Sequence, residues 1–113
     1  MTRTAMKAAS IGCFLVAVSV AGAVAAADIQ AGQAKVKDVC QACHGMDGNS
    51  QSPDYPKLGG QYPDYLAKAL RDYKSGARKN PIMAGFAGGL SKQDIENVAA
   101  YYSSQPSTVA TKH

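Results

Sequence analysis

The chain has 113 residues, with twelve basic and eight acidic side chains, and 46% of its residues are hydrophobic. This length favours a single domain, and a formal net charge of +4 is too small for the strongly basic surface of a nucleic-acid-binding protein. Arg3 and Lys7 lie in a segment that we expect to be removed, which leaves a net charge of +2. We therefore expect no nucleic-acid partner.

The first 27 residues have the pattern of a cleaved secretory signal peptide. Residues 1–10 are basic, residues 11–27 carry no charge, and this apolar run ends in three alanines before Asp28. The alternative is a retained membrane anchor, but the run has 17 residues, fewer than the roughly 20 that span a bilayer. We expect cleavage, a periplasmic location and no stable membrane insertion. Cleavage also removes Cys13 and leaves two cysteines.

The mature chain is predicted to be all-α, with one domain at 28–106 and a flexible tail at 107–113. No run of residues shows the sustained alternation of a β-strand. A domain of this size is marginal on its own core, and the mature chain has only four leucines and one phenylalanine. Such a composition is typical of a protein that folds around a large apolar cofactor.

Three main helices are predicted. The first begins at the N-cap Asp28 and runs into the cysteine motif. After a loop at 45–61, the second carries apolar residues at helical spacing from Tyr62 to Tyr73. The third begins at Ser91, where Asp94 completes a near capping box, and ends near 105–106. Residues 80–89 are predicted to be a glycine-rich loop with at most one helical turn.

The motif V-C-Q-A-C-H-G at 39–45 is compatible with three chemistries. A structural zinc site needs four protein ligands, and besides Cys40, Cys43 and His44 the mature chain offers only His113, which lies in the tail. A thiol–disulfide pair of the thioredoxin type lies in a βαβ unit, which a chain without strands does not provide. This reading stays as the non-haem alternative.

A covalently bound haem c explains more of the sequence. In C-x-x-C-H the two thiols form thioether bonds to the haem vinyl groups. Cys40 and Cys43 lie about one helical turn apart, so they reach one edge of the ring. His44 then lies over the iron, and the ring supplies the apolar core that the chain lacks.

The second iron ligand is predicted by elimination. His113 lies in the tail, and Met46 follows His44 too closely to reach the opposite face of the ring. Met83 remains, in a segment whose glycines allow the backbone to approach a flat surface. Without the motif, Met83 would be interpreted as a core residue that fills a gap.

Five stretches now show that the chain resembles a class I c-type cytochrome, and most closely one domain of the bacterial di-haem cytochromes of the c-four type. They are C-Q-A-C-H-G-M-D-G-N-S, Y-P-K-L-G-G-Q, Y-L-A-K-A-L-R-D-Y-K-S-G-A-R, the segment around Met83, and L-S-K-Q-D-I-E-N-V-A-A-Y-Y-S-S-Q. They cover nearly the whole mature chain in family order. One C-x-x-C-H is present, so this chain is expected to carry one haem.

The resemblance implies further residue roles. Pro56 would offer its carbonyl to the second ring nitrogen of His44, which fixes the ring orientation. Leu58 would pack on the haem. Gly32 would allow the first helix to cross the last closely, beside Tyr101. Val36 and Val98 would pack next to this crossing.

The resemblance and the ligand set predict a monomeric periplasmic electron carrier and not an enzyme, because His/Met ligation leaves no open iron site. Its expected partners are redox proteins, such as a membrane cytochrome complex, a terminal oxidase, or a periplasmic reductase or dehydrogenase. One alternative is a haem electron-relay subunit of a periplasmic dehydrogenase or reductase complex. Another is a haem sensor or weak peroxidase, in which Met83 would dissociate.

Overall fold

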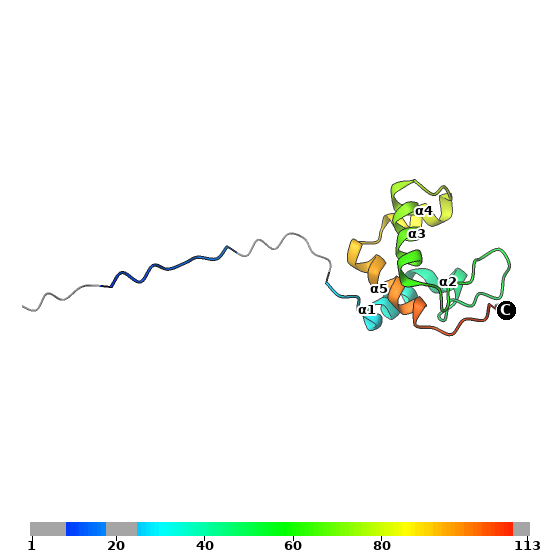
Figure 1. The fold of residues 1–113 in the computed structure, drawn as a ribbon. Helices are drawn as coiled ribbons and strands as arrows, with labels where there is room; N and C mark the ends of the chain where they lie inside the picture. Colours follow the sequence, from blue (N-terminus) through cyan, green and yellow to red (C-terminus); the bar gives the residue numbers. More distant parts are fainter. Residues whose placement is uncertain (1–8, 18–24, 110–113) are drawn as a thin grey trace, which may run out of the picture.

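The computed structural model describes residues 9–17 and 25–109, and the part from Ile29 onward is a small bundle of helices (Figure 1). The elements are α1 (Ile29–Lys35), the π-helical turn η1 (Val36–Cys40), α2 (Gln41–His44), α3 (Pro63–Ser75), α4 (Pro81–Gly88) and α5 (Lys92–Ser103). The described residues contain no strand, so the all-α prediction is confirmed. None of the described helices has the length and apolar character that crossing a bilayer requires.

Parts of the predicted leader and of the predicted tail lie outside the described residues. These parts are residues 1–8, 18–24 and 110–113. Within the described ranges, residues 9–17 and 25–28 form no helix. The proposed boundary after residue 27 therefore stays a prediction, to be tested on the mature protein.

The first predicted helix is divided by a π-helical turn just before the cysteine motif. Asp28 caps α1 as expected, because its carboxylate accepts from the backbone N–H groups of Gln30 and Ala31. The π-helical turn then covers Val36–Cys40, and such turns are frequent at functional sites. Val36 is fully buried in the core while Cys40 is only partly buried. The sequence pattern predicted one regular helix here, because a π-turn leaves no strong local signal.

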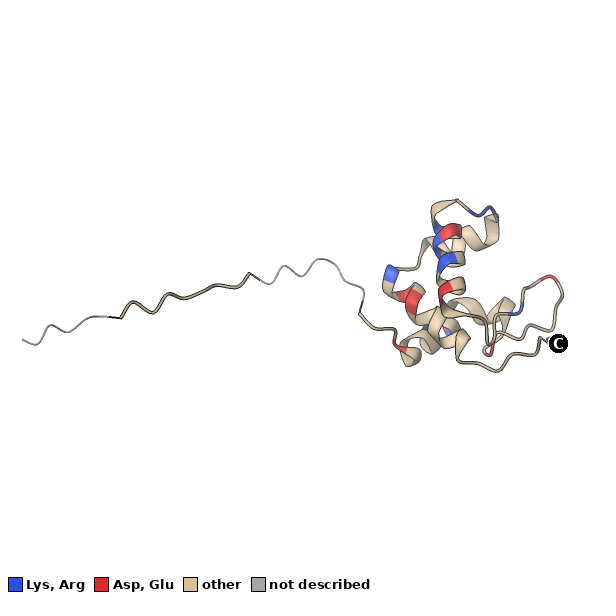
Figure 2. Cartoon of the chain, in the orientation of Figure 1, with Lys and Arg blue, Asp and Glu red and all other residues tan. Residues whose placement is uncertain are grey.

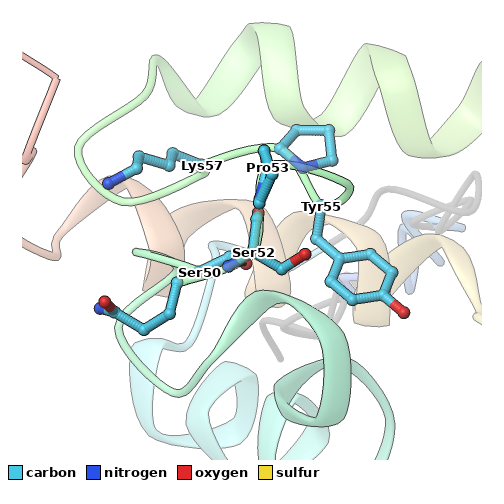
Figure 3. A pocket seen from close by; sticks show the side chains of 7 residues that line it. Ser50, Ser52, Pro53, Tyr55 and Lys57 are labelled. Atoms are coloured by element: carbon cyan, nitrogen blue, oxygen red, sulfur yellow. Dashed lines mark hydrogen bonds between the residues drawn. The ribbon is translucent and has the colours of Figure 1, made fainter.

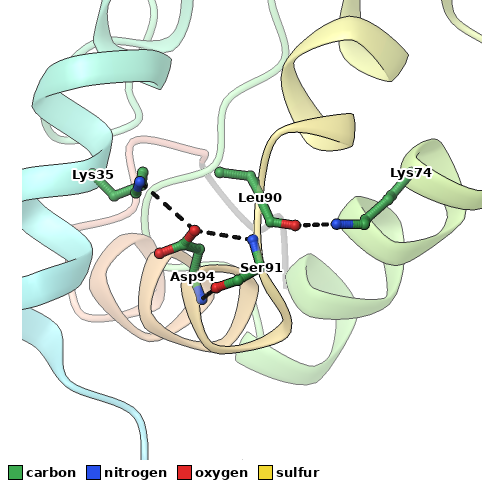
Figure 4. Close-up of polar contacts among 5 residues, drawn as sticks. All are labelled: Lys35, Lys74, Leu90, Ser91 and Asp94. Carbon is green, nitrogen blue, oxygen red and sulfur yellow. Dashed lines mark hydrogen bonds and ion pairs between the residues drawn. The ribbon is translucent and has the colours of Figure 1, made fainter.

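The core lies between α1, α3 and α5, and two polar contacts at the start of α5 join these helices. Ser91 and Asp94 form the predicted capping box, with Ser91 Oγ 3.0 Å from the Asp94 nitrogen. Lys35 of α1 lies 3.6 Å from the Asp94 carboxylate, and Lys74 of α3 donates to the carbonyl of Leu90 (Figure 4). The start of α5 is thus tied to both neighbouring helices.

The segment around Met83 differs from its prediction, because Pro81–Gly88 is a helix of eight residues and not a loop with at most one turn. Asn80 accounts for the difference. Its side-chain oxygen accepts from the backbone N–H groups of Ile82 (3.0 Å) and Met83 (3.1 Å). Pro81 occupies the first helical position, where its missing N–H costs nothing. Asn80 and Pro81 together indicate the start of a helix. The prediction of a loop gave more weight to the glycines of the segment.

The chain after α5 runs back along the loop that follows the cysteine motif. Residues 105–109 form no helix. The buried Asn49 donates to the carbonyl of Pro106 (2.8 Å) and accepts from the hydroxyl of Thr108 (2.8 Å). Lys57 Nζ also lies 3.0 Å from that hydroxyl. The described part of the predicted tail is therefore anchored, although it is exposed.

Candidate functional site

One cleft brings together every site residue that the sequence predicted. Its lining includes Cys40, Cys43, His44, Pro56, Leu58 and Met83. These residues come from η1, α2, the loop before α3, and α4. Much of the remaining lining is apolar, with Val39, Leu66, Ala69, Leu70, Ile82, Phe86 and Val98. The cleft is therefore an apolar site with two thiols, one imidazole and one thioether.

Both thiols line the cleft and form no disulfide with each other. Cys40 ends η1 and Cys43 lies in α2, and both are partly buried. Burial raises the pKa of the Cys40 thiol to about 11, and Lys35 offsets only part of this rise. A thiol with such a pKa stays protonated at neutral pH, whereas redox-active cysteines have lowered pKa values. This environment disfavours the thiol–disulfide alternative.

His44 is held in one orientation by Pro56. Its side chain is buried, and its Nδ1 atom lies 2.9 Å from the Pro56 carbonyl oxygen. Because a carbonyl oxygen can only accept, Nδ1 carries the proton and Nε2 keeps its lone pair. The ring of Tyr55 meets the imidazole edge-on, with 6.4 Å between ring centroids. The arrangement leaves Nε2 as the atom of His44 available to a metal.

Met83 and Met46 differ in their relation to the cleft. Met83 is partly buried near the start of α4 and lines the cleft. Met46 packs instead against the core cluster and is absent from the cleft lining. Leu58 belongs to both environments, because it contacts the core cluster and also lines the cleft. Of the two methionines after residue 27, Met83 is thus the one placed at the site.

Three polar residues at the same cleft were not among the predicted site residues. Arg78, Tyr65 and Gln61 all contribute to its lining. The guanidinium carbon of Arg78 lies 4.9 Å above the centre of the Tyr73 ring. The hydrogen bond that Arg78 donates to the Tyr65 side-chain oxygen, and then the nearby Tyr73, raise the pKa of Arg78. A basic residue shortly after a Tyr-rich helix was the available signal, but sequence spacing alone does not place Arg78 at the cleft.

A second hollow lies in the loop that follows the cysteine motif. Figure 3 shows Ser50, Ser52, Pro53, Tyr55 and Lys57 around it. It offers hydroxyl, amide and ammonium groups but no thiol, imidazole or thioether. The chemistry predicted from the motif therefore belongs to the first cleft.

Comparisons with known proteins identify the family of the chain. A family model described as "Cytochrome C oxidase, cbb3-type, subunit III" matches residues 27–101. Cytochrome c4 from Stutzerimonas stutzeri is 50% identical over 94 residues, which cover 75% of this chain and 44% of that protein. Cytochrome c-554(548) from Halomonas halodenitrificans is 46% identical over 83 residues, which cover 71% of this chain and 99% of that protein.

A solved structure shows the same relationship. The crystal structure of reduced recombinant cytochrome c4 from Pseudomonas stutzeri superposes with a TM-score of 0.69 at 48% identity. The match covers 74% of this chain and 48% of that one. The chain therefore spans a little less than half the length of the cytochrome c4 proteins that it matches.

Proposed function

This chain belongs to the class I c-type cytochromes, and from that premise we propose that it is an electron carrier with one haem c in the cleft. The observation that carries the proposal is the convergence of two thiols, an imidazole with a free Nε2 and a thioether in one apolar cleft. When bound, the haem iron supplies one-electron chemistry by cycling between its ferrous and ferric states.

The residues of the cleft fit a haem. Cys40 and Cys43 line the same cleft within one short helical stretch, so both are placed to form thioether bonds to one ring. His44 would bind the iron through Nε2, because Nδ1 is engaged by Pro56. Met83 would bind from α4, an element separate from the one that carries His44. Leu58 and the apolar lining would cover the ring and exclude water.

The same ligand set favours electron transfer over catalysis. Two protein ligands on the iron leave no position for a substrate. An apolar surrounding holds few dipoles that must reorient when the charge of the iron changes. The chain therefore contributes binding, orientation and exclusion of water, and no acid–base or nucleophilic step is required of it.

The charge distribution of the chain does not predict a partner that is drawn to it by strong electrostatic attraction. Figure 2 shows both signs along α3, which carries Asp64 and Asp72 as well as Lys68, Arg71 and Lys74. The mature net charge of +2 is close to zero once two haem propionates are counted. We propose redox proteins as partners, such as a membrane cytochrome complex, a terminal oxidase, or a periplasmic reductase or dehydrogenase. Association with them is expected to depend only weakly on salt.

A second candidate function is an electron-relay subunit of a larger enzyme. The description of the matching family model names an oxidase subunit, which favours this alternative. Size-exclusion chromatography of a native extract separates the two roles. A free carrier elutes as a small monomer, whereas a relay subunit elutes with its catalytic partner.

The test of the proposed function is a pyridine haemochrome spectrum of the protein purified from the periplasm. We expect a c-type spectrum with one haem per chain and an N-terminus at Asp28. A protein without covalent haem would overturn the proposal. Rapid binding of carbon monoxide to the ferrous protein at neutral pH would instead show an open iron site, as in a sensor or peroxidase.

A further inference from the structure

Two chain segments meet at the His44–Pro56 contact, and both are attached to Tyr102. This tyrosine lies near the end of α5 and is 1% exposed. Its hydroxyl donates to the carbonyl oxygen of Gly45, the residue after His44, at 2.9 Å. Its backbone carbonyl accepts from the N–H of Gly60, four residues after Pro56, at 3.0 Å. Tyr102 thus holds the residue after His44 through its side chain and the chain four residues after Pro56 through its backbone.

The two segments are also joined to each other beside the Tyr102 ring. The carbonyl of Gly48 accepts from the N–H groups of Leu58 (2.7 Å) and Gly59 (3.2 Å). A Cβ atom at Gly48 would lie 2.7 Å from Cδ1 of Tyr102, so the ring packs directly on this backbone. The position of the chain after Pro56, relative to the chain after His44, is therefore set by these two backbone hydrogen bonds and by the Tyr102 ring that packs against them.

The chain before Pro56 contributes less to its position. The hydrogen bonds of residues 50–55 are mostly local, such as Ser52 N to Ser50 Oγ (3.1 Å) and Tyr55 N to Ser52 O (3.3 Å). Pro56 itself is exposed. Burial raises the pKa of the Tyr102 hydroxyl, so this group remains a protonated donor to Gly45. The contact of the hydroxyl with Gly45, on the C-terminal side of His44, is thus kept over the physiological pH range, and the bond from Gly60 to the Tyr102 carbonyl involves no titratable group.

We propose that Tyr102 is a positioning residue that sets the His44–Pro56 hydrogen bond and, through it, the reduction potential of the iron. This inference rests on the proposed function, in which His44 binds the iron. A carbonyl that accepts from the ring N–H makes the imidazole a stronger ligand, and a stronger donor stabilises ferric iron relative to ferrous iron. Loosening the contact should therefore raise the potential.

The test compares two hydroxyl deletions in the haem-containing protein. Tyr102→Phe keeps the ring but removes the donor to Gly45, and we expect a higher midpoint potential and faster solvent exchange of the His44 Nδ1 proton. Tyr101→Phe is the control for the loss of a buried tyrosine hydroxyl. This neighbour is also buried, 5.7 Å away between ring centroids, and within the described chain no hydrogen bond of its hydroxyl is found. We expect no change in potential for the control. Tyr102 also lines the cleft, so the exchange of the His44 Nδ1 proton separates an effect through His44 from a direct effect on the haem. Equal potentials in wild type and Tyr102→Phe, or equal shifts in both variants, would overturn the proposal.

Hydrogen exchange of the wild type tests the same inference if Tyr102→Phe fails to fold. The hydrogen bonds that protect the Nδ1 proton of His44 and the amide proton of Gly60 should open with the same free energy, because both depend on Tyr102. The inference would be contradicted if the hydrogen bond of the His44 proton opens at least about tenfold more often than the hydrogen bond of the Gly60 amide. Such a ratio corresponds to a difference of about 1.4 kcal/mol in opening free energy. The wild-type NMR spectrum keeps the two proposals apart. If His44 does not bind the iron, the proposed function fails, whereas a bound His44 with an unmoved potential refutes only the role of Tyr102.

Discussion

Gly32 of α1 lies directly against the backbone of Asn97 in α5. A Cβ atom built on Gly32 would lie 2.6 Å from the carbonyl carbon of Asn97 and 2.9 Å from Cβ of Tyr101. The side chain of Asn97 continues the contact, because its oxygen accepts from the N–H of Asp28 at 2.9 Å. The first and last helices can therefore cross at this distance only because residue 32 has no side chain.

Gly32→Ala should lower the free energy of unfolding of the haem-containing protein by about 1–3 kcal/mol, a typical cost of overpacking. The loss should occur although alanine is the better helix former. Gly85→Ala is the control, since a Cβ atom there meets nothing within 4 Å in the middle of α4. Denaturant titration measures both variants. A Gly32→Ala protein as stable as the wild type would mean that the helices separate at little cost.

Met83→Leu should leave the haem covalently attached but lower the reduction potential and open the iron to carbon monoxide. Leucine has a similar volume and no sulfur, so the change removes the ligand with little loss of packing. Met46→Leu is the matched control, because Met46 packs on the core cluster and does not line the cleft. Absorption spectra with and without carbon monoxide, and potentiometric titrations, measure the ligation and the reduction potential of both variants. If only Met46→Leu changes the spectrum, Met83 is the wrong ligand.

Cys40→Ala and Cys43→Ala should each keep the haem attached through the remaining cysteine. One haem vinyl group then stays unsaturated, so the pyridine haemochrome band should move to longer wavelength. The double variant should carry no covalent haem. Cys13→Ala, in the proposed leader, should leave the spectrum and haem content of the mature protein unchanged. A changed spectrum in the Cys13 variant would contradict cleavage after residue 27.

Asp94→Asn should reduce stability in a pH-dependent way. The backbone N–H of Ser91 is the largest cause that lowers the pKa of Asp94, and Lys35 contributes in the same direction. The pKa of Asp94 in the folded protein therefore lies below its unfolded value of about 3.9. Its stabilising effect is full above that value and is lost as the pH falls through the folded pKa.

We expect Asp94→Asn to cost about 1 kcal/mol at pH 7, as for the loss of a helix cap. The difference from the wild type should shrink as the pH falls below about 4. Glu96→Gln, which removes an exposed pair with Arg71, should cost no more than about 0.5 kcal/mol. Thermal unfolding across this pH range measures both variants. A difference for Asp94→Asn that does not depend on pH would contradict the assigned hydrogen bond.

Local rules predicted most elements because the relevant groups are close in sequence. The N-caps at Asp28 and Ser91 were correct, and so was the second helix with Pro63 in its first turn. The helix at Pro81–Gly88 was missed because its glycines suggested a loop, although Asn80 and Pro81 were sufficient to start a helix. The π-helical turn at Val36–Cys40 was also missed, since it leaves no strong local signal in the sequence.

The sequence by itself determined the chemistry of the site, because thiols three residues apart and the histidine next to them are fixed by the covalent chain. It also led to Met83 as the predicted second iron ligand, because it left no other suitable residue. Only the tertiary structure decided that Met83 lines the cleft of Cys40 and Cys43, and that Pro56 faces Nδ1 of His44. These relationships join residues that are far apart in sequence, so they depend on how the helices pack. The contacts of Tyr102 with Gly45, Gly48 and Gly60 also depend on helix packing. They form only when α5 packs against the loop that follows the motif.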